Sequence, residues 1–407
     1  MEPDVSHLMS VASASAELDA SELASPGVES VPLHQATGRV LARAVFADRP
    51  YPPFDRAMMD GFAARSIDGE AVRRVAGEVA AGRVFDRAMQ PGEAVSIMTG
   101  APLPEGADAV MPVEYAERSP DGATVRFTRP LQAGACVAAR GSEAPAGREV
   151  LPVGRLIGSP EIAVAATVGA CELPVFARPT VAVLSTGDEI VPPEGRLERA
   201  AQIRDANGSM LAALLSRLGC RVTRVDRCPD TPERLRQAID AGLSSADVLF
   251  VSGGASMGRY DHVPALLSEA GLELRVTKVR IRPGKPFVFA RRRAGNGGRF
   301  AFGLPGNPVS AFACTLRLAD RLLRRMQGLP PEPRWVAARL LEPLASANGP
   351  REFCQPAKWD GTGVRPLKWI GSADVFTLVE ADALLVRPEA DPPRSNGEEV
   401  RLLEIPR

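Results

Sequence analysis

Histidine is scarce in this sequence, and closely paired cysteines are missing. The 407 residues include only three histidines, which are His7, His34 and His262. So few histidines nearly exclude a histidine-based catalytic triad or a multi-histidine metal centre. None of the six cysteines stands in a C-x-x-C pair, which argues against a zinc cage. Any chemistry must therefore rely on carboxylates, cations, hydroxyls and backbone amides.

The sequence also lacks an excess of charge and any targeting or membrane segment. Its 49 basic and 49 acidic residues balance, so no long-range field favours nucleic acid or an anionic membrane as a partner. The N-terminus has no basic segment followed by an apolar one, and no apolar run is long enough to cross a bilayer. Scattered cysteines in a chain of this size are typical of reduced thiols. We therefore expect a cytoplasmic protein.

The length predicts several domains, because 407 residues exceed one ordinary hydrophobic core. Residues 47–146 are rich in Gly, Pro and Val with short alternating runs, which predicts a β-rich module. A Pro-rich break near Leu329 predicts the last boundary. The expected division has a discontinuous N-terminal helical and linker subdomain (1–46 and 147–177), the β-rich module (47–146), an α/β domain (178–329) and a C-terminal β domain (330–407).

Strands and helices alternate after Pro179. The apolar run TVAVLST predicts a strand buried on both faces, and a helix over 208–218 follows, with leucines at helical spacing. The segments RVTRVDR, DVLFVSG and LELRVTKV predict further strands, separated by helices over 232–243 and 263–270. A hairpin then leads into a helix over 308–326. This order predicts a multidomain α/β fold with a central doubly wound parallel sheet.

Polar, glycine-rich loops follow the strands of this domain, and a parallel sheet gathers such loops at one edge. Their backbone amides could hold phosphate oxygens. Any single loop could instead be a tight turn, and Arg259 and Tyr260 replace the Lys and Ser/Thr of an ordinary phosphate loop. Asn307 also suits a helix N-cap, and Pro308 a first helical position. The candidate binding residues are Gly187, Asp188, Gly253, Gly254, Ser256, Gly258, Pro305, Gly306, Asn307 and Pro308.

Two further segments combine charge with unusual composition. In VTKVRIRPGKP, a strand would place Lys278, Arg280 and Arg282 on one face. These cations are either solvated or hold an oxyanion. In YPPFDRAMMDGFA, Asp60 is either a turn residue before Gly61 or a functional carboxylate.

Several motifs occur along the chain in a fixed order: PPFDRAMMDGFA, IMTGAPLPEGADAV, ARGSEAPAG, STGDE, DANG, SGGASMGRYDHV, RPGKP and LPGNPVS. In this order and spacing the chain resembles, from Pro32 to Val386, the molybdopterin molybdenumtransferases, the family that includes the E domain of gephyrin. The resemblance implies that the α/β domain is like that of the molybdopterin adenylyltransferases. It implies a homodimer whose active site lies between this domain and the second subdomain of the partner chain.

The activity implied by the resemblance is a step of molybdenum cofactor biosynthesis. A magnesium-dependent transferase of this family inserts molybdate into adenylyl-molybdopterin, releasing AMP and giving Mo-molybdopterin. The dithiolene sulfurs of the pterin are the nucleophiles, which explains why no protein cysteine or histidine is needed. The resemblance also implies transient contact with a molybdopterin adenylyltransferase and with acceptor molybdoenzymes.

Position by position, the resemblance assigns roles to individual residues. Asp261 and Glu189 would hold magnesium. The expected catalytic acidic and hydroxyl residues are Asp60, Thr99, Glu189, Asp230 and Asp261, and the expected oxyanion contacts are Lys278, Arg282, Arg351 and Ser372.

This sequence departs from the usual family pattern at several of its motif positions. Arg56-Ala57-Met58 stands where Asn-Ser-Ala is common, and Arg282 stands where lysine is usual. Glu143, in a segment that matches R-G-x-D from Arg140, stands where aspartate is usual. The sign of the charge survives at Arg282 and Glu143.

Two other functions share part of this pattern. A nucleotide hydrolase or plain adenylyltransferase could share the α/β domain alone, but would not need the MMDGFA module or the C-terminal β domain. A non-catalytic scaffold or pterin-binding protein could keep the whole fold, but retention of Asp60, Glu189 and Asp261 argues against lost chemistry.

Overall fold

A computed structural model describes residues 7–254, 262–292, 298–347 and 349–406. The chain divides into two compact units. Unit 1 comprises Met1–Glu29, Gly38–Ala42 and Val175–Arg407, and unit 2 comprises Ser30–Thr37 and Arg43–Pro174. In the described part of the chain, no helix has both the length and the apolar character needed to cross a membrane.

Unit 1 contains an α/β sandwich built on one six-stranded sheet. The strands lie in the order β16-β13-β17-β21-β20-β18. Their bounds are β13 (Thr180–Thr186), β16 (Arg221–Cys228), β17 (Val248–Ser252), β18 (Glu273–Val276), β20 (Val288–Arg291) and β21 (Phe300–Leu304). The first four strands of that order run parallel, as the alternation predicted. β20 runs antiparallel to both neighbours, because it forms the predicted hairpin with β21.

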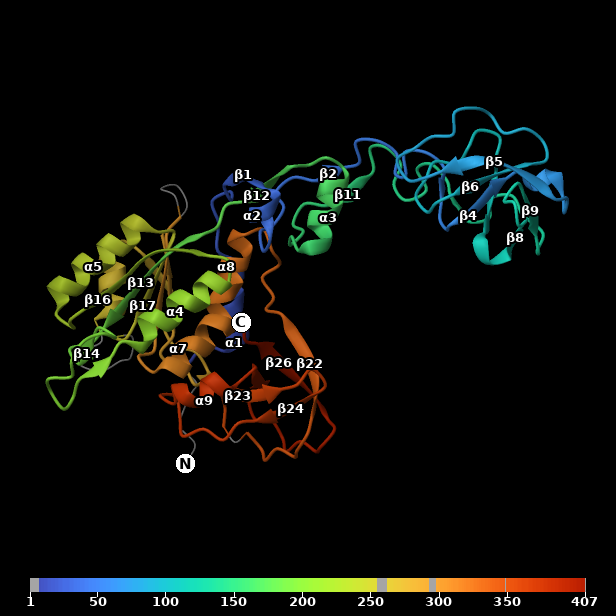
Figure 1. The fold of residues 1–407 in the computed structure, drawn as a ribbon. Helices are drawn as coiled ribbons and strands as arrows, with labels where there is room; N and C mark the ends of the chain where they lie inside the picture. Colours follow the sequence, from blue (N-terminus) through green and yellow to red (C-terminus); the bar gives the residue numbers. More distant parts are fainter. Residues whose placement is uncertain (1–6, 255–261, 293–297, 348, 407) are drawn as a thin grey trace. The chain divides into compact units, whose positions relative to one another are not determined.

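Helices cover both faces of this sheet (Figure 1). Leucines of α4 and the apolar side chains of α1, α7, η3 and α8 pack on one face, and α5 and α6 pack on the other. The apolar spacing in the sequence explains this doubly wound arrangement. The bounds are α1 (Val11–Asp19), α4 (Ala206–Arg217), α5 (Pro232–Ser245), α6 (Val263–Glu269), α7 (Pro308–Cys314), the π-helical turn η3 (Thr315–Ala319) and α8 (Asp320–Met326).

The first helix, α1, belongs to unit 1 rather than with residues 147–174. Val11, Ala14 and Leu18 join the hydrophobic core of the sandwich, and Asp19 accepts from Arg321 of α8. The first helix therefore packs with the α/β sandwich, whereas the expected division placed it in a discontinuous subdomain formed by residues 1–46 and 147–177. The four-part division itself stays a prediction.

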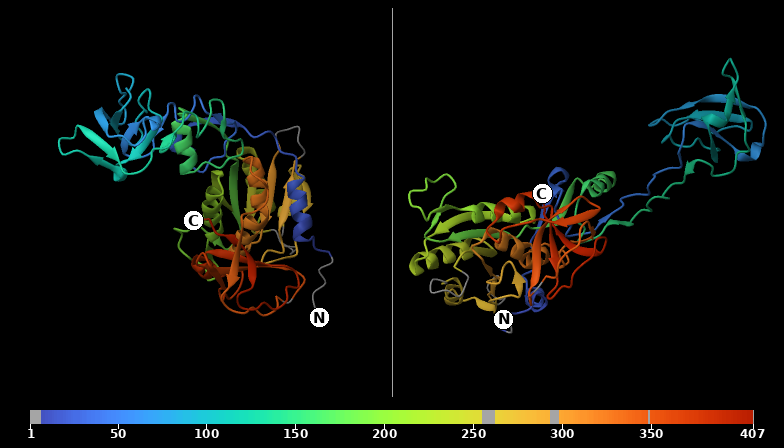
Figure 2. Two further views of the ribbon diagram at one scale, coloured as in Figure 1. Left: turned by 90° about the vertical axis from the view of Figure 1, so that its right-hand side faces the viewer. Right: turned by 90° about the horizontal axis from the view of Figure 1, so that it is seen from below.

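The C-terminal β domain of unit 1 is a closed barrel (Figure 2, red strands). Its strands lie in the order β19-β23-β24-β22-β26-β25, and β25 also pairs with β23, which closes the sheet. The bounds are β19 (Ile281–Arg282), β22 (Trp335–Leu340), β23 (Glu352–Trp359), β24 (Gly363–Pro366), α9 (Val375–Glu380), β25 (Ala383–Arg387) and β26 (Glu399–Glu404). Cys354 and Leu384 of the barrel share the core of the sandwich, so the two layers pack together. A short pair, β14 (Ile190–Val191) and β15 (Ile203–Arg204), extends from the end of β13.

Unit 2 contains the predicted β-rich module as a six-stranded sheet in the order β7-β4-β6-β5-β9-β8. Two of the short alternating runs from which this module was predicted, AVSIM and TVRFT, lie in β6 and β9. Two apolar clusters fill its two sides. The bounds are η1 (Ser66–Asp68), β4 (Gly61–Ala64), β5 (Arg73–Val79), β6 (Glu93–Ile97), β7 (Ala109–Pro112), η2 (Val113–Tyr115), β8 (Ala116–Arg118) and β9 (Thr124–Phe127).

Several short elements, which are not strands of this sheet, complete the described chain. They are β1 (Val28–Pro32), α2 (Leu33–Ala36), β2 (Val45–Phe46), β3 (Arg56–Ala57), β10 (Val137–Ala138), β11 (Glu149–Leu151), α3 (Ser159–Thr167) and β12 (Glu172–Phe176). They pair as β1 with β12, β2 with β11 and β3 with β10.

Candidate functional site

Three of the parallel strands of unit 1 end level with one another. In the register of the sheet, Ser185 of β13 lies beside Ser252 of β17, and Ser252 lies beside Leu304 of β21. The loops that follow therefore emerge at one edge, as the sequence predicted. We call this edge the strand-end site. It contains Gly187, Asp188, Gly253, Gly254, Pro305, Gly306, Asn307 and Pro308.

Glycine at 253 is required by the fold itself. A Cβ atom there would lie 2.4 Å from the carbonyl oxygen of Thr186, and its φ is +99°. Its amide donates to the carbonyl of Leu304 at 3.1 Å. The nearest neighbour of a Cβ on Gly306 would be Gly253 Cα, at 3.8 Å. The glycines thus allow the backbones of three loops to approach closely, as expected if the loops are tight turns. The same close approach places all three loops within reach of one ligand.

Asn207 ties these loops together, and the sequence analysis assigned it no role. Its Nδ2 donates to Ser252 Oγ at 2.7 Å and to the carbonyl of Gly306 at 2.6 Å. Its Oδ1 is buried and has no hydrogen-bond partner in the described structure. Asp205 fixes the start of α4 by accepting from the Gly208 amide at 2.8 Å and from Ser185 Oγ at 3.0 Å. Both residues belong to the motif DANG, and these contacts explain why the motif contains an aspartate and an asparagine.

The acidic residues of the strand-end site lie on the surface around β13. Thr186 Oγ1 donates to the carboxylate of Asp230, and the Asp230 amide donates to Asp188 Oδ1 at 3.1 Å. The Glu189 carboxylate folds back over Gly187, where a Cβ would lie 2.6 Å from Glu189 Oε2. Burial, and then the charges of Asp230 and Asp188, raise the pKa of the Cys228 thiol. That thiol is therefore not poised as a nucleophile.

The described residues hold no group of three or more His, Cys, Asp or Glu side chains that could bind a metal ion. Glu189, one predicted magnesium ligand, is exposed within the described structure. Asp261, the other, lies outside the described residues, as do Ser256 and Gly258.

A pair of arginines lies where the sandwich meets the barrel. β19 pairs with β23 so that Ile281 lies beside Glu352 and Arg282 beside Phe353, and Arg351 immediately precedes β23. This register brings the two arginines into the same region, and burial, followed by the charge of Arg282, lowers the pKa of the Arg351 guanidinium. Neither side chain forms an ion pair within the described structure, whereas Arg317 pairs with Glu352 at 2.7 Å. Unpaired neighbouring guanidiniums suit a planar, bidentate grip on an anion.

The structure corrects the shared face predicted for Lys278, Arg280 and Arg282. β18 ends at Val276, and the chain then leaves the sheet and joins the barrel at β19. Arg280 Nε instead pairs with Glu389 at 3.3 Å. Lys278 is half-buried and has no acidic partner in the described part of the chain. Alternation along a strand cannot order these side chains, because the segment changes sheets between them.

Ser372 reaches the strand-end site from the barrel. Asn307 Nδ2 donates to Ser372 Oγ at 2.7 Å, and the Val309 amide donates to the Ser372 carbonyl at 3.0 Å. α7 begins at Pro308 as predicted, but the Asn307 side chain makes no capping hydrogen bond. The Val309 amide at this helix start is thus already satisfied by protein rather than free for an anion.

In unit 2, Asp60 and Thr99 form a compact contact. Thr99 donates to Asp60 Oδ1 through its amide and through Oγ1, each at 2.7 Å. These two donors lower the pKa of the Asp60 carboxyl, amide first. The next residue, Gly61, must be glycine, because a Cβ there would lie 1.9 Å from the Met111 carbonyl oxygen. Asp60 is therefore an exposed, ionised carboxylate held in one orientation.

The same loop carries two contacts to the segment that starts at Arg140. Arg56 pairs with Glu143 at 2.5 Å, and the Arg140 amide donates to Asp55 Oδ1 at 2.7 Å. Pairing of β3 with β10 runs alongside these contacts. The Asp60 loop is thus fixed by both backbone and side chains.

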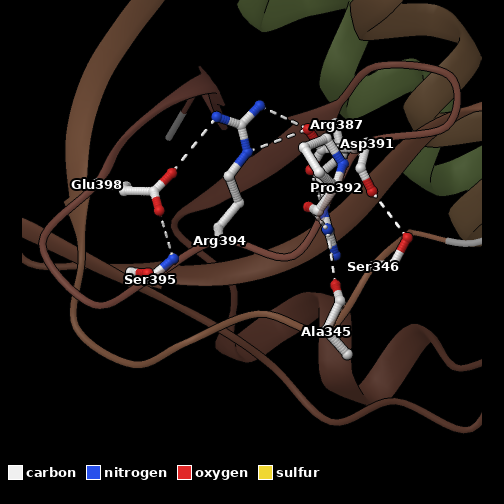
Figure 3. Close-up of polar contacts among 8 residues, drawn as sticks. All are labelled: Ala345, Ser346, Arg387, Asp391, Pro392, Arg394, Ser395 and Glu398. Atoms are coloured by element: carbon white, nitrogen blue, oxygen red, sulfur yellow. Dashed lines mark hydrogen bonds and ion pairs between the residues drawn. The ribbon is translucent and has the colours of Figure 1, made fainter.

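The barrel also holds a cavity of about 380 Å³, beside the polar network of Figure 3. Buried Asp391 accepts from Arg387 Nε at 2.8 Å and from Arg394 at 2.6 Å, and Arg387 also donates to the Ala345 carbonyl at 2.8 Å. Because Arg387 and Arg394 are already paired with Asp391, we interpret the network as one that stabilises the barrel rather than as an anion-binding site.

Comparison with known proteins covers the chain in three consecutive segments. Family models match the MoeA N-terminal region (domain I and II) over residues 9–169, a probable molybdopterin binding domain over 182–325 and the MoeA C-terminal region (domain IV) over 337–405. A molybdopterin molybdenumtransferase of Nostoc sp. is 30% identical over 391 residues, covering 93% of this chain and 89% of the relative. One of Staphylococcus aureus is 31% identical over 369 residues, covering 88% and 86%.

The chain belongs to the molybdopterin molybdenumtransferase family. The crystal structure of a molybdopterin biosynthesis MoeA protein from Pyrococcus horikoshii is similar over 98% of this chain and 99% of that one, with 32% identity and a TM-score of 0.78. The predicted fold class and family are thus confirmed. Arg56 and Glu143, two of the positions at which the sequence departs from the expected motif pattern, pair with each other in the structure.

Proposed function

We propose that this chain is a molybdopterin molybdenumtransferase that inserts molybdate into adenylyl-molybdopterin, releases AMP and yields Mo-molybdopterin. The observation that carries the proposal is the full-length family match. It includes the Asp60 loop of unit 2 and the barrel that carries Arg351 and Ser372. A hydrolase or adenylyltransferase that shares only the α/β domain needs neither.

The oxyanion is proposed to bind at Arg282 and Arg351, with Lys278 and Ser372 as further contacts. Two close guanidiniums without carboxylate partners repel each other, and a bound dianion would remove that repulsion. Because the groups are already in place, they would not have to reorganise around the anion. Neutral Ser372, held by Asn307, would add a hydrogen bond without adding charge.

The adenylylated pterin is proposed to lie along the strand-end site. Backbone amides of the loops containing Gly187, Gly253, Gly254 and Gly306 would face its phosphates. Buried Asn207 Oδ1 offers an acceptor for a ligand N–H or O–H group. Pro305, Asn307 and Pro308 shape the third loop. The roles proposed for Asp60, Thr99, Asp188, Glu189 and Asp230, and for Ser256, Gly258 and Asp261 outside the described residues, follow the family assignment.

Magnesium is part of the proposal on chemical grounds, because phosphates beside carboxylates are repelled without a cation. Glu189 is the proposed ligand within the described structure, together with Asp261 outside it. The described carboxylates alone do not form a metal cage.

The proposed setting is a cytoplasmic homodimer that binds neither nucleic acid nor membrane. It would receive its substrate from a molybdopterin adenylyltransferase and deliver its product to acceptor molybdoenzymes. The balanced charge of the chain agrees with small-molecule substrates that bind at a local basic site.

AMP release tests this function directly. Purified protein is incubated with adenylyl-molybdopterin and magnesium, with and without molybdate, and AMP is measured by chromatography. The expected result is AMP release that requires molybdate. AMP release that ignores molybdate would indicate a hydrolase, and no AMP under any condition would indicate a scaffold; either outcome overturns the proposal.

A further inference from the structure

The guanidinium of Arg282 lies over an aromatic stack in the barrel. Its Cζ is 4.9 Å from the centroid of the Phe353 ring. Phe353 in turn stacks on Trp369, with ring centroids 6.3 Å apart and an interplanar angle of 25°. The parallel register of β19 and β23, which sets Arg282 beside Phe353, creates this order of guanidinium, phenyl and indole.

The Phe353 ring is the contact that holds the guanidinium of Arg282. Arg282 is exposed, and within the described structure its side chain forms no hydrogen bond or ion pair. Its backbone, by contrast, is fixed: Pro283 and Gly284 are buried, and a Cβ on Gly284 would lie 2.3 Å from Cys314 Sγ. A long side chain on a fixed backbone still has several rotamers unless its end is held.

Repulsion from Arg351 makes such a hold necessary. The charge of Arg282 lowers the pKa of the Arg351 guanidinium, and because like charges repel, an unrestrained Arg282 would turn away from Arg351 into solvent. An aromatic face attracts the cation and lies flat against a planar guanidinium. A lysine ammonium has no plane to match, which gives arginine a physical reason to stand at 282.

The segment behind the stack also leads to the site. Trp369 lies three residues before Ser372, whose hydroxyl accepts from Asn307. One short stretch of the barrel therefore backs Phe353 and also contacts the strand-end site. Simple barrel packing would explain the two rings, but it does not explain a cation placed over the exposed end of the stack.

We propose that Phe353, backed by Trp369, is a positioning residue that holds the Arg282 guanidinium beside Arg351 for the incoming molybdate. This inference rests on the proposed function. It concerns only the oxyanion half of the site, so molybdate affinity should change while pterin affinity should not.

The test compares wild type with Phe353→Leu and Phe353→Tyr. Leucine keeps an apolar side chain and removes the ring, so the KM for molybdate should rise about two- to fivefold, the worth of an exposed cation–π contact. The KM for adenylyl-molybdopterin and kcat at saturating molybdate should stay at wild-type values. Phe353→Tyr should restore the molybdate KM.

A second background separates positioning from packing. In Arg282→Ala, which itself should raise the molybdate KM, Phe353→Leu should have no additional effect. Equal effects of Phe353→Leu with and without Arg282 would show that the ring acts through the fold, and would overturn the inference. If Phe353→Leu does not fold, Trp369→Leu provides the same comparison from the other side of the ring.

A binding measurement distinguishes failure of this inference from failure of the proposed function. Trp335 and Trp359 are replaced by phenylalanine, so that Trp369 fluorescence alone reports titration with molybdate. Phe353→Leu should weaken the molybdate response two- to fivefold even if no AMP is formed. A wild-type enzyme that turns over with molybdate while Phe353→Leu leaves both KM and the fluorescence titration unchanged overturns only the inference.

Discussion

Arg56 and Glu143 are two positions at which the sequence departs from the motif pattern that its resemblance implies, and the Arg56 guanidinium donates to the Glu143 carboxylate. Both side chains are substantially exposed, at 40% and 54%. An exposed ion pair contributes at most about 1 kcal/mol to stability. Its value must therefore lie in holding the Asp60 loop against the Arg140 segment, and the two departures should be interdependent.

Arg56→Asn and Glu143→Asp test this dependence. Arg56→Asn alone leaves Glu143 without its cation, and Glu143→Asp alone shortens the acid beyond reach of Arg56, so each should lower kcat/KM several-fold. The double variant carries asparagine and aspartate, the pair that the resemblance implies, and should recover most of the activity. Steady-state AMP release measures all three, with thermal unfolding as the control for folding. A double variant as impaired as the product of the two single effects would mean that the pair is not a unit.

Thr99 supplies both hydrogen bonds that lower the pKa of Asp60. Thr99→Val removes the hydroxyl donor but keeps the amide, so the pKa of Asp60 should rise toward its ordinary value, and Thr99→Ser should keep it low. Because the carboxylate is then protonated at a higher pH than in the wild type, the carboxyl ¹³C shift of Asp60 should titrate at higher pH in Thr99→Val. An unchanged titration would mean that the hydroxyl does not stabilise the ionised form.

At the scale of residues, sequence order predicted which loops meet but not which side chains touch. Asn207 and Gly306 are 99 positions apart, and Asn307 and Ser372 are 65 apart. The first contact depends on the order of the strands in the sandwich, and the second on how the barrel packs on the sandwich; no local pattern encodes either. The stack of Arg282 on Phe353 is missed for the same reason, since it follows from a strand pairing between distant segments.

At the scale of elements, helices and most strands followed from apolar spacing and turn residues. The predicted helix over 308–326 forms one helical run, but η3 inserts a π-helical turn over Thr315–Ala319. The strand predicted for 272–279 stops at Val276. Both exceptions lie where the sandwich, the RPGKP turn and the barrel pack together, so tertiary contacts override the local pattern there.

Asp320, at the start of α8, is a buried carboxylate with an unfavourable environment. Burial raises its pKa from 3.8 to about 6, although Arg324, Arg334 and Arg321 act in the opposite direction. The native state therefore binds more protons than the unfolded state between these values. Stability should fall as pH rises from about 4 to about 6, and then stay level.

Asp320→Asn should remove this penalty. At pH 8 the variant should be more stable than wild type by up to about 3 kcal/mol, two pKa units' worth, and the gain should vanish below about pH 4. Urea unfolding at several pH values measures it. Asp19→Asn is the matched control, because it removes the acid that pairs with Arg321 and should destabilise α8 instead. A constant difference between Asp320→Asn and wild type at all pH values would contradict the titration of Asp320.

At the scale of the whole molecule, the order of β module, α/β sandwich and C-terminal β domain was predictable because each has its own local periodicity. Closure of the barrel was not predictable, because it depends on the pairing of β25 with β23, and nothing in the sequence of either segment indicates that they pair. The packing of α1 on α8 could not be predicted either, because the apolar face of a short helix does not indicate which other element will cover it.

The division of the site residues between two units makes subunit complementation informative. Asp60 and Thr99 belong to unit 2, whereas Arg282, Arg351 and the strand-end site belong to unit 1. The homodimer proposed above would combine unit 2 of one chain with unit 1 of its partner. At a molybdate concentration well below the raised KM of Arg282→Ala, Asp60→Asn and Arg282→Ala should each lose most activity in separate preparations.

Co-refolding the two variants should then restore activity. Random pairing makes half of the dimers mixed, and a site built in trans is intact at one of the two positions of each mixed dimer, so about a quarter of wild-type activity should return. A site built within one chain predicts no recovery, because every chain would carry one lesion. Sedimentation establishes whether the chains are dimeric at the assay concentration. Full wild-type activity from a monomer, or dimers that show no recovery after mixing, would place the complete site in a single chain.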